Sequence, residues 1–399
     1  MKLSRFPIGV IVIAQLLGTS LWFSPNSAAE SLAHAWGIST PEVAQLTSAV
    51  QLGFIAGTLL LATSGLADRF AASRIFCIAS LLGAAFNATF ALAPISFCQA
   101  LLVRGAVGVC LAGIYPLGMK MVISWSKGNA GKTLGLLVAM LTMGTALPHG
   151  VRAMGASWSW QAVVLTSSVL ALVGGAVIAA LGDGPHLRGL TATRSKSWGA
   201  ALTVFREPAF RSAAMGYFGH MWELYAFWAV APFLVANVLS VGGDDARAGA
   251  SLVTFVVIAS GALGCVAAGI LSQRYGSARV AAAALALSGA MCLVFPIAAH
   301  HGTVALCIAI LLIWGISVIA DSAQFSALSA QACPPHLLGS ALAIQNSIGF
   351  LVTVLPINLV VGMVGKLGPD VAWLLLPGPI VGLAFLRSLV YPGMRRLPG

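Results

Sequence analysis

The stretch SGLADRFAASR at residues 64–74 has a counterpart in GILSQRYGSAR at residues 269–279. Both stretches are short and basic, and each lies between long apolar segments. Four positions correspond at a constant offset of 205 residues: Leu66 with Leu271, Arg69 with Arg274, Phe70 with Tyr275, and Arg74 with Arg279. Gly144 and Gly349 are separated by the same offset. An offset shared by separated places indicates an internal repeat, so we interpret the chain as two matching halves.

The composition places these halves in a membrane. Of the 399 residues, 59% are apolar and only 8% are charged, whereas a soluble chain carries roughly a quarter charged residues. One membrane-spanning helix takes about 20 apolar residues. Apolar segments of suitable length lie at residues 7–29, 42–64, 75–94, 98–124, 133–150, 161–182, 209–235, 248–272, 280–299, 303–330, 338–361 and 371–390. This pattern excludes a soluble enzyme, a disordered chain and a protein with a single anchor.

The resulting prediction is an all-α polytopic membrane protein with twelve transmembrane helices in two pseudo-symmetric six-helix bundles. We expect the N-terminal bundle at residues 1–182 and the C-terminal bundle at residues 209–399. The polar stretch 183–208 between them is interpreted as a cytoplasmic linker. Gly53 and Gly57, four residues apart in one span, predict a close helix contact.

The basic residues predict the orientation in the membrane. The net charge of +11 does not indicate a nucleic-acid partner, because no run of five or six basic residues occurs. Most Lys and Arg lie in one set of alternate loops, and the other set holds only Arg152, Arg247 and Lys366. Cytoplasmic loops carry the excess of positive charge. We therefore expect a protein of the plasma membrane (the inner membrane of a bacterium) that is surrounded by the lipid bilayer and has both termini in the cytoplasm.

The stretch at 64–74 resembles the signature Gly-x-Leu-Ala-Asp-Arg-x-Gly-Arg-Arg of the major facilitator superfamily of secondary transporters. Residues 66–69 match this signature, whereas Ser64 and Ala71 replace its two glycines. Ala72 and Ser73 replace its basic pair, and Arg74 follows directly. The resemblance implies a fold of two six-helix halves that rock alternately around a site near the midplane of the bilayer. It also implies transport of a small molecule, and we expect a monomer.

The resemblance further implies a conformational gate on the cytoplasmic side. In the family, the Asp and Arg of this loop tie the two halves together, which assigns Asp68 and Arg69 to the gate. Arg74 and the repeated Arg274 and Arg279 belong to the same set. By analogy Asp68 would interact with the start of the span at 338–361, where a helix N-terminus favours a carboxylate.

We expect Asp68→Asn to impair transport without abolishing membrane insertion. Solute uptake into cells, compared with the amount of protein in the membrane fraction, checks this expectation. Uptake at the wild-type rate would contradict it.

Charged residues at membrane depth are costly and usually have a role. Glu223 lies midway along the span 209–235, and His220 precedes it by three residues on the same helix face. A carboxylate and an imidazole in a partly dry cavity can each exchange protons near neutral pH. We hypothesise that this pair couples transport to protons; the alternative is a polar pair that pins the helix to a neighbour. Asp321, in the span 303–330, is a second candidate for proton or substrate binding.

Two cations in the span 98–124 are further candidates. Arg104, with Gly105 and Gly108, resembles a second motif of the family, which implies a structural and proton-relay role. The alternative is that Arg104 binds a substrate anion. Lys120 lies near the cytoplasmic end of the same span. There a lysine either faces the cavity or extends its ammonium group to the lipid headgroups.

Polar and aromatic residues inside the spans are candidates for the cavity lining. They are Gln15, Trp22, Asn26, Gln51, Tyr217, Trp222, Tyr225, Gln345 and Asn346. The aromatic rings suit a planar solute such as a vitamin or a nucleobase, and packing between helices is the alternative. 

The sequence therefore predicts a secondary active transporter of a small organic solute, with protons as the coupling ion. The alternatives are an uncoupled facilitator of a planar or aromatic solute and a transporter-like membrane receptor. The sequence contains no His-Glu-x-x-His or Gly-x-Ser-x-Gly motif, either of which would suggest an enzyme. It contains no Cys-x-x-Cys pair, which would suggest a metal site. We expect no cofactor.

Overall fold

The computed structural model describes residues 5–125, 130–155, 158–185, 202–240, 249–334 and 337–391, without the side chains of Asp68 and of residues 130–134. All regular elements in these ranges are helices. Nine helical stretches in them are long and apolar enough to cross a membrane, and the last one joins two helices, α17 and α18. Together with α1 and α7 they form the twelve predicted spans.

The N-terminal half supplies six long helices and three short ones. The spans are α1 (Pro7–Thr19), α3 (Thr40–Ser64), α5 (Ala72–Leu92), α6 (Phe97–Trp125), α7 (Ala130–Met154) and α8 (Trp160–Leu181). The short elements are the 3₁₀ turn η2 (Asn26–Ala28), α2 (Ala29–Trp36) and α4 (Leu66–Arg69).

The C-terminal half has the same order of spans, but two of them consist of two helices. Its elements are η4 (Val204–Arg206), α10 (Pro208–Ser240), α12 (Ala250–Ala259), α13 (Gly261–Tyr275), α14 (Ser277–His301), α15 (Val304–Ser317), α16 (Ser322–Gln331), α17 (Leu338–Leu367), η5 (Gly368–Leu375) and α18 (Pro377–Val390). The division of the chain at residues 183–208 stays a prediction, because residues 186–201 lie outside the described ranges.

Local signals explain several helix boundaries. The Ser39 backbone N–H and hydroxyl both donate to the Glu42 carboxylate at 2.7 Å, which caps α3 at its start. Gly65 ends α3 with a φ of 66°, a conformation that favours glycine. This glycine directs the chain into the short helix α4 and the rest of the stretch at residues 64–74, hereafter the motif loop.

Three predicted spans differ from the continuous helices expected. The first helix ends at Thr19, ten residues before the predicted limit, and Pro25 lies in the irregular segment that follows. The eighth span is interrupted at Ser260, and the tenth at residues 318–321. At the second and third breaks the sequence stays mostly apolar, so apolar periodicity does not reveal them. At the first break Ser24, Pro25 and Asn26 form a turn signal within the apolar stretch.

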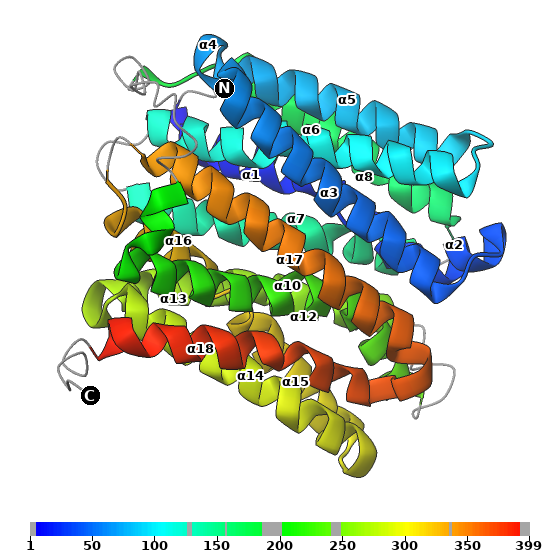
Figure 1. Ribbon diagram of the computed structural model, residues 1–399. Helices are drawn as coiled ribbons and strands as arrows, with labels where there is room; N and C mark the ends of the chain where they lie inside the picture. Colours follow the sequence, from blue (N-terminus) through cyan, green and yellow to red (C-terminus); the bar gives the residue numbers. More distant parts are fainter. Residues whose placement is uncertain are drawn as a thin grey trace.

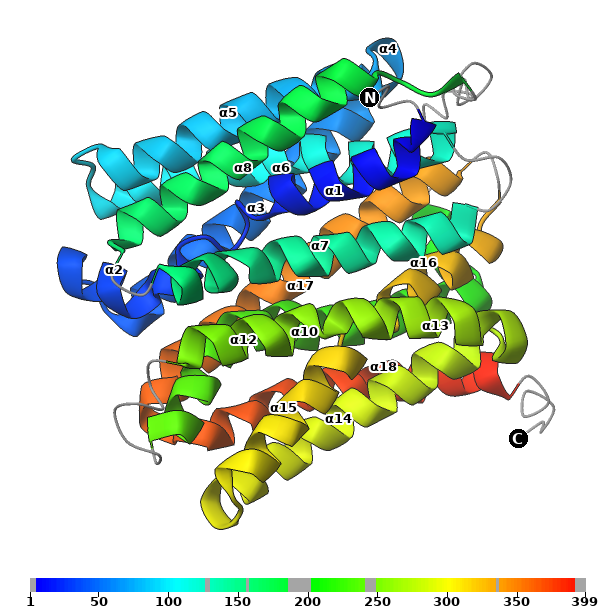
Figure 2. The same cartoon turned by 180° about the vertical axis from the view of Figure 1, so that it is seen from behind.

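The two halves lie side by side with their long helices roughly parallel (Figures 1 and 2). From the N-terminal half, α3 packs on α17 and α7 packs on α12 and α13. At one contact the Asn358 amide of α17 donates to the Ser48 hydroxyl of α3 at 2.7 Å. The start of α1 and the end of α18 lie at the same end of the molecule (Figure 1), as an even number of spans requires.

Glycines bring corresponding helix pairs into backbone contact in both halves. A Cβ atom on Gly53 of α3 would lie 1.9 Å from the Gly105 carbonyl oxygen of α6. In the C-terminal half, a Cβ on Gly264 of α13 would lie 1.9 Å from the Ile316 carbonyl oxygen of α15. The close helix contact predicted at Gly53 is therefore confirmed.

We expect Gly53→Ala to lower the thermal stability of the purified protein, because the added methyl group forces α3 away from α6. Overpacking of this kind costs about 1–3 kcal/mol. Gly9→Ala is the matched control, since a Cβ on Gly9 meets no atom within 4 Å. Equal melting temperatures for Gly53→Ala and Gly9→Ala in detergent would contradict the prediction.

Candidate functional site

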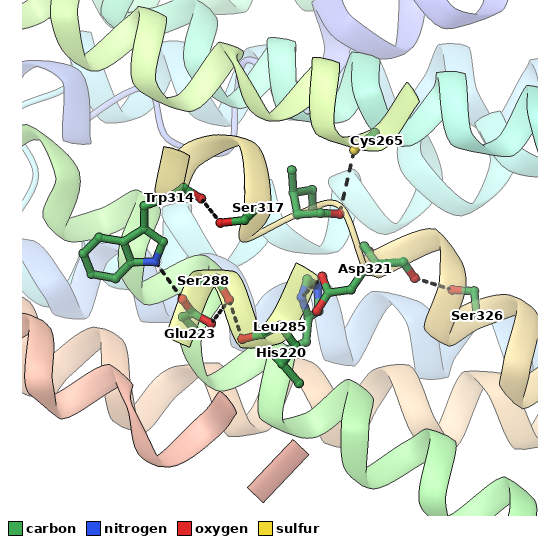
Figure 3. Close-up of polar contacts among 11 residues, drawn as sticks. His220, Glu223, Cys265, Leu285, Ser288, Trp314, Ser317, Asp321 and Ser326 are labelled. Carbon is green, nitrogen blue, oxygen red and sulfur yellow. Dashed lines mark hydrogen bonds and ion pairs between the residues drawn. The ribbon is translucent and has the colours of Figure 1, made fainter. Parts of the chain in front are cut away.

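Glu223 is a buried carboxylate that accepts hydrogen bonds from two neighbouring helices. It lies in the middle of α10 and is 1% exposed. The Trp314 indole of α15 donates to Oε1 at 2.7 Å, and the Ser288 hydroxyl of α14 donates to Oε2 at 2.9 Å (Figure 3). The Cys292 thiol, also on α14, donates to Oε1 at 3.5 Å. Each carboxylate oxygen thus has a donor, and no cation contacts it among the described residues.

His220 pairs with Asp321, not with Glu223. His220 Nδ1 lies 2.7 Å from Asp321 Oδ1, and both side chains are 1% exposed. Figure 3 shows the imidazole and the carboxylate pointing toward each other, beside the Glu223 cluster. His220 Nε2 has no hydrogen-bond partner in the described part of the chain. The sequence predicts His220 and Glu223 as a pair and Asp321 as a separate candidate; the structure places the three near one another and pairs His220 with Asp321 instead.

The break between α15 and α16 places Asp321 opposite His220. Residues 318–321 leave the α-helical path, and Asp321 becomes the residue that precedes α16. The Ile319 carbonyl in this segment faces the Cys265 thiol of α13, at 3.8 Å. Non-helical backbone at membrane depth persists only where protein covers it or where it lines a cavity. Here α13 and α10 cover it.

Arg104 of α6 organises a polar cluster inside the N-terminal half. Its guanidinium donates to Asn87 Oδ1 at 2.7 Å and to the carbonyls of Leu21 and Trp22 at 3.2 and 2.8 Å. These two carbonyls lie just beyond the end of α1, where no backbone N–H of a following helical turn donates to them. Arg104 is 0% exposed. Arg104 therefore donates hydrogen bonds to the backbone carbonyls that follow the premature end of α1.

Asn87 completes this cluster. Its amide nitrogen donates to the Val164 carbonyl and the Ser168 hydroxyl of α8, at 2.9 and 3.0 Å. Its amide oxygen accepts from the Ser24 hydroxyl at 3.0 Å as well as from Arg104. Three helices, α5, α6 and α8, meet the irregular segment after α1 at this point, and the Arg104 side chain is directed to them and not to Glu223 in the other half.

Aromatic rings join the two halves at their interface. The Trp22 ring lies 4.9 Å from Phe54 in its own half, and 5.5 and 5.7 Å from Tyr225 and Phe350 in the other half, measured between ring centroids. The Phe54 and Phe350 centroids are 4.4 Å apart. Trp22 and Tyr225 were predicted to line a cavity; Phe54 and Phe350 were missed, because nothing in a run of apolar residues distinguishes them.

Three predicted glutamines carry buried polar atoms without a partner in the described part of the chain. They are both amide atoms of Gln15 on α1, Nε2 of Gln51 on α3 and Oε1 of Gln345 on α17. Gln51 uses its other amide atom, Oε1, to accept from the Trp22 indole at 3.2 Å. Such groups are rare in native proteins and need an explanation.

Other predicted residues lie elsewhere. The Asn26 amide donates to the Thr47 hydroxyl at 3.0 Å, near the start of α3. The Trp222 indole donates to the Leu374 carbonyl of η5 at 3.1 Å, within the C-terminal half. Tyr217 is buried against Gly349, whereas Asn346 is half-buried. The Lys120 ammonium donates to the Ala67 carbonyl of α4, which joins it to the motif loop.

The gate residues lie at helix ends on either side of the two repeated turns: Arg69 in α4 and Arg74 in α5, Arg274 in α13 and Arg279 in α14. The side chains of Arg69, Arg74, Arg274 and Arg279 are exposed, and the Asp68 side chain lies outside the described residues. A missed residue, Asp183, caps α5: its carboxylate accepts from the backbone N–H groups of Ala72 and Ser73 at 3.0 and 2.7 Å. It was assigned to the linker, and its sequence position says nothing about this contact.

Comparison with known proteins agrees with this architecture. The sequence profile of the Major Facilitator Superfamily matches residues 11–355. Among solved structures, the chain is similar to a partially occluded, inward-open conformation of the xylose transporter XylE from E. coli, with a TM-score of 0.75. The two sequences are 12% identical, and the match covers 96% of each chain, so the likeness concerns the fold. No curated protein sequence shows a significant match.

Proposed function

The chain belongs to the Major Facilitator Superfamily and is a membrane transporter, and we propose that it moves a small organic solute in exchange for, or together with, protons. The observation that carries this proposal is the cluster of three buried titratable groups, Glu223, His220 and Asp321, on α10 and beside the break before α16. A charge at this depth is costly unless it is paired or neutralised by a proton. Helix movements that change its partners therefore change its proton occupancy.

The geometry supports separate tasks for the members of this cluster. Only uncharged groups donate hydrogen bonds to Glu223, so its negative charge is neutralised by protonation of the carboxylate. The His220–Asp321 pair connects α10 with the break in the tenth span. When the two halves rock, α10 and the broken span can move relative to one another, which opens or closes this pair.

We assign the solute site to the interface where the aromatic rings lie, with the unpartnered glutamines as its candidate polar groups. The rings pack on one another at centroid distances of 4.4–5.7 Å, and a planar solute would stack on them in the same offset manner once rocking of the halves separates them. The unpartnered amides of Gln15, Gln51 and Gln345 supply donors and acceptors that a bound polar solute would use. Together they favour a planar solute with hydrogen-bonding groups on its edge.

The loop charges support a proposal for the orientation in the membrane. With most Lys and Arg in one set of loops, we propose that the protein lies in the plasma membrane with both termini in the cytoplasm.

Reconstitution into liposomes with a panel of labelled solutes tests the function, with and without an imposed pH gradient. The expected result is accumulation of a planar solute above its equilibrium level only when the gradient is present, together with movement of protons. Equilibration unaffected by the gradient would instead support an uncoupled facilitator. Binding of a solute with no flux would support a receptor.

We expect Gln15→Met to raise the stability of the solute-free protein and to weaken transport. Leaving a buried polar group unpaired costs about 1–3 kcal/mol, which an apolar side chain of similar length removes. The same amide is then absent for the solute, so KM should rise by about tenfold, equal to about 1.4 kcal/mol. Thermal unfolding and uptake kinetics measure the two effects.

Asn87→Leu is the matched control for this variant, because the amide of Asn87 is fully bonded. It should destabilise the protein. A loss of stability in Gln15→Met as large as that in Asn87→Leu would show that Gln15 is part of the packing and not of the solute site.

A further inference from the structure

Two crevices open on the outer surface of the molecule, one in each half. The first lies between α3, α5 and α6 and has a volume of about 310 Å³. The second lies between α13, α14 and α15 and has a volume of about 400 Å³. Their walls are almost entirely apolar, and each includes one arginine: Arg74 in the first crevice and Arg279 in the second.

The two crevices are the same feature built twice. Seven lining positions correspond at the offset of the sequence repeat: Leu66 with Leu271, Phe70 with Tyr275, Arg74 with Arg279, Ile75 with Val280, Ile78 with Ala283, Ala79 with Ala284, and Leu82 with Leu287. The repeat thus preserves a surface cavity and not only a motif. Exposed apolar side chains border both crevices, such as Leu82 and Leu287, and this surface of a transmembrane protein faces lipid.

The charges at the two mouths differ, although the walls correspond. Near the first crevice, Arg69 and Arg74 are accompanied by Asp68 in the same loop and by Asp183, whose carboxylate caps the helix that carries Arg74. In the second loop, residues 269–279, two arginines occur without any Asp or Glu. The second loop is therefore purely basic, whereas the first combines acidic residues with its arginines and with Lys120, whose ammonium donates to the Ala67 carbonyl.

The second mouth has the groups that an anionic headgroup requires. Arg279 lies in the first turn of α14, where the helix dipole also attracts an anion. The Arg274 guanidinium lies over the Tyr275 ring, at 5.4 Å from its centroid, and that ring is part of the crevice wall. Both arginines are exposed and form no ion pair within the described ranges. Tyrosine is enriched at the level of lipid headgroups.

We propose that the crevice between α13, α14 and α15 binds an anionic phospholipid, with an acyl chain in the crevice and the phosphate at Arg274 and Arg279. The crevice of the other half has corresponding lining residues, but its loop also carries acidic residues, so we expect no preference for an anionic lipid there. Ala320 and Ser317 form part of the second wall, directly before Asp321. A bound chain therefore contacts the helix break that holds Asp321 against His220, through which lipid occupancy reaches the proposed coupling site.

Native mass spectrometry of the purified protein tests the binding step, with phosphatidylglycerol and phosphatidylcholine as competing probes. The wild type should retain phosphatidylglycerol in preference. The double variant Arg274→Gln/Arg279→Gln should lose this preference by roughly tenfold, because each arginine near the membrane surface contributes to the attraction of anionic lipid. The matched variant Arg69→Gln/Arg74→Gln, at the first crevice, should change it less than about twofold.

A second pair of variants tests the cavity and not the charge. Ala284→Phe fills the second crevice and should displace the retained lipid, whereas Ala79→Phe fills the first and should leave it bound. Loss of preference in both double variants, or full retention in Ala284→Phe, would overturn the proposal. The binding measurement does not depend on the proposed function; only the link to Asp321 does, so either can fail separately.

Discussion

Glu223→Gln is expected to abolish accumulation of solute driven by a pH gradient while solute exchange across the membrane continues. Glutamine keeps the size of the side chain and an oxygen that accepts from Trp314 and Cys292, so the contacts between α10, α14 and α15 are largely preserved. It removes the group that carries the proton. We expect gradient-driven accumulation to fall by at least about tenfold, equal to about 1.4 kcal/mol of coupling.

Uptake and counterflow in the same liposomes separate coupling from transport in this variant. Glu42→Gln is the matched control, because Glu42 is a glutamate in the capping box of α3, far along the chain from the cluster. It should cost some stability and leave coupling unchanged. Asp321→Asn tests the other carboxylate. Persistence of gradient-driven transport in both Glu223→Gln and Asp321→Asn would disprove proton coupling at this cluster.

Arg104→Ala is expected to be the most destabilising single substitution at the sites described above. It leaves the carbonyls of Leu21 and Trp22 and the amide oxygen of Asn87 without their cationic donor, and it opens a cavity where a fully buried side chain lay. Removing one member of a buried charged network costs about 2–4 kcal/mol. The free energy of unfolding in detergent measures the loss.

Arg104→Lys distinguishes a structural role from a requirement for charge alone. Lysine restores the positive charge but does not reproduce the planar fork that reaches Asn87 and two carbonyls together. It should recover less than half of the lost stability. If Arg104→Ala unfolds like the wild type but no longer transports an anionic solute, Arg104 belongs to the solute site and the structural interpretation fails.

The spans and the intramembrane charges were predictable, because each rests on a local property. About 20 apolar residues suffice to identify a span, and a charge such as Glu223 is conspicuous within one. The partners of these charges were not predictable. His220 was matched with Glu223 by helical spacing, but the structure pairs it with Asp321, because an interruption of the tenth span turns that carboxylate toward α10.

The glutamines illustrate the same limit. The sequence shows directly that a polar residue lies within an apolar span, as is true of Gln15, Gln51 and Gln345. Whether such an amide is bonded between helices, as Asn87 is, or left without a partner depends on residues from other spans. The aromatic neighbours Phe54 and Phe350 carry no local signal, since a phenylalanine in a span is ordinary.

The sequence by itself determined that the chain crosses a membrane repeatedly, that its two halves are related by an offset of 205 residues, and which few charges lie at membrane depth. These are properties of composition and spacing, which can be determined without knowledge of tertiary contacts. Only the tertiary structure decided where α1 ends, which donors hold Glu223, and that the repeated loops border matching crevices with different charge. Each of these depends on side chains brought together from distant parts of the chain, and in a uniformly apolar sequence no local pattern distinguishes one such packing from another.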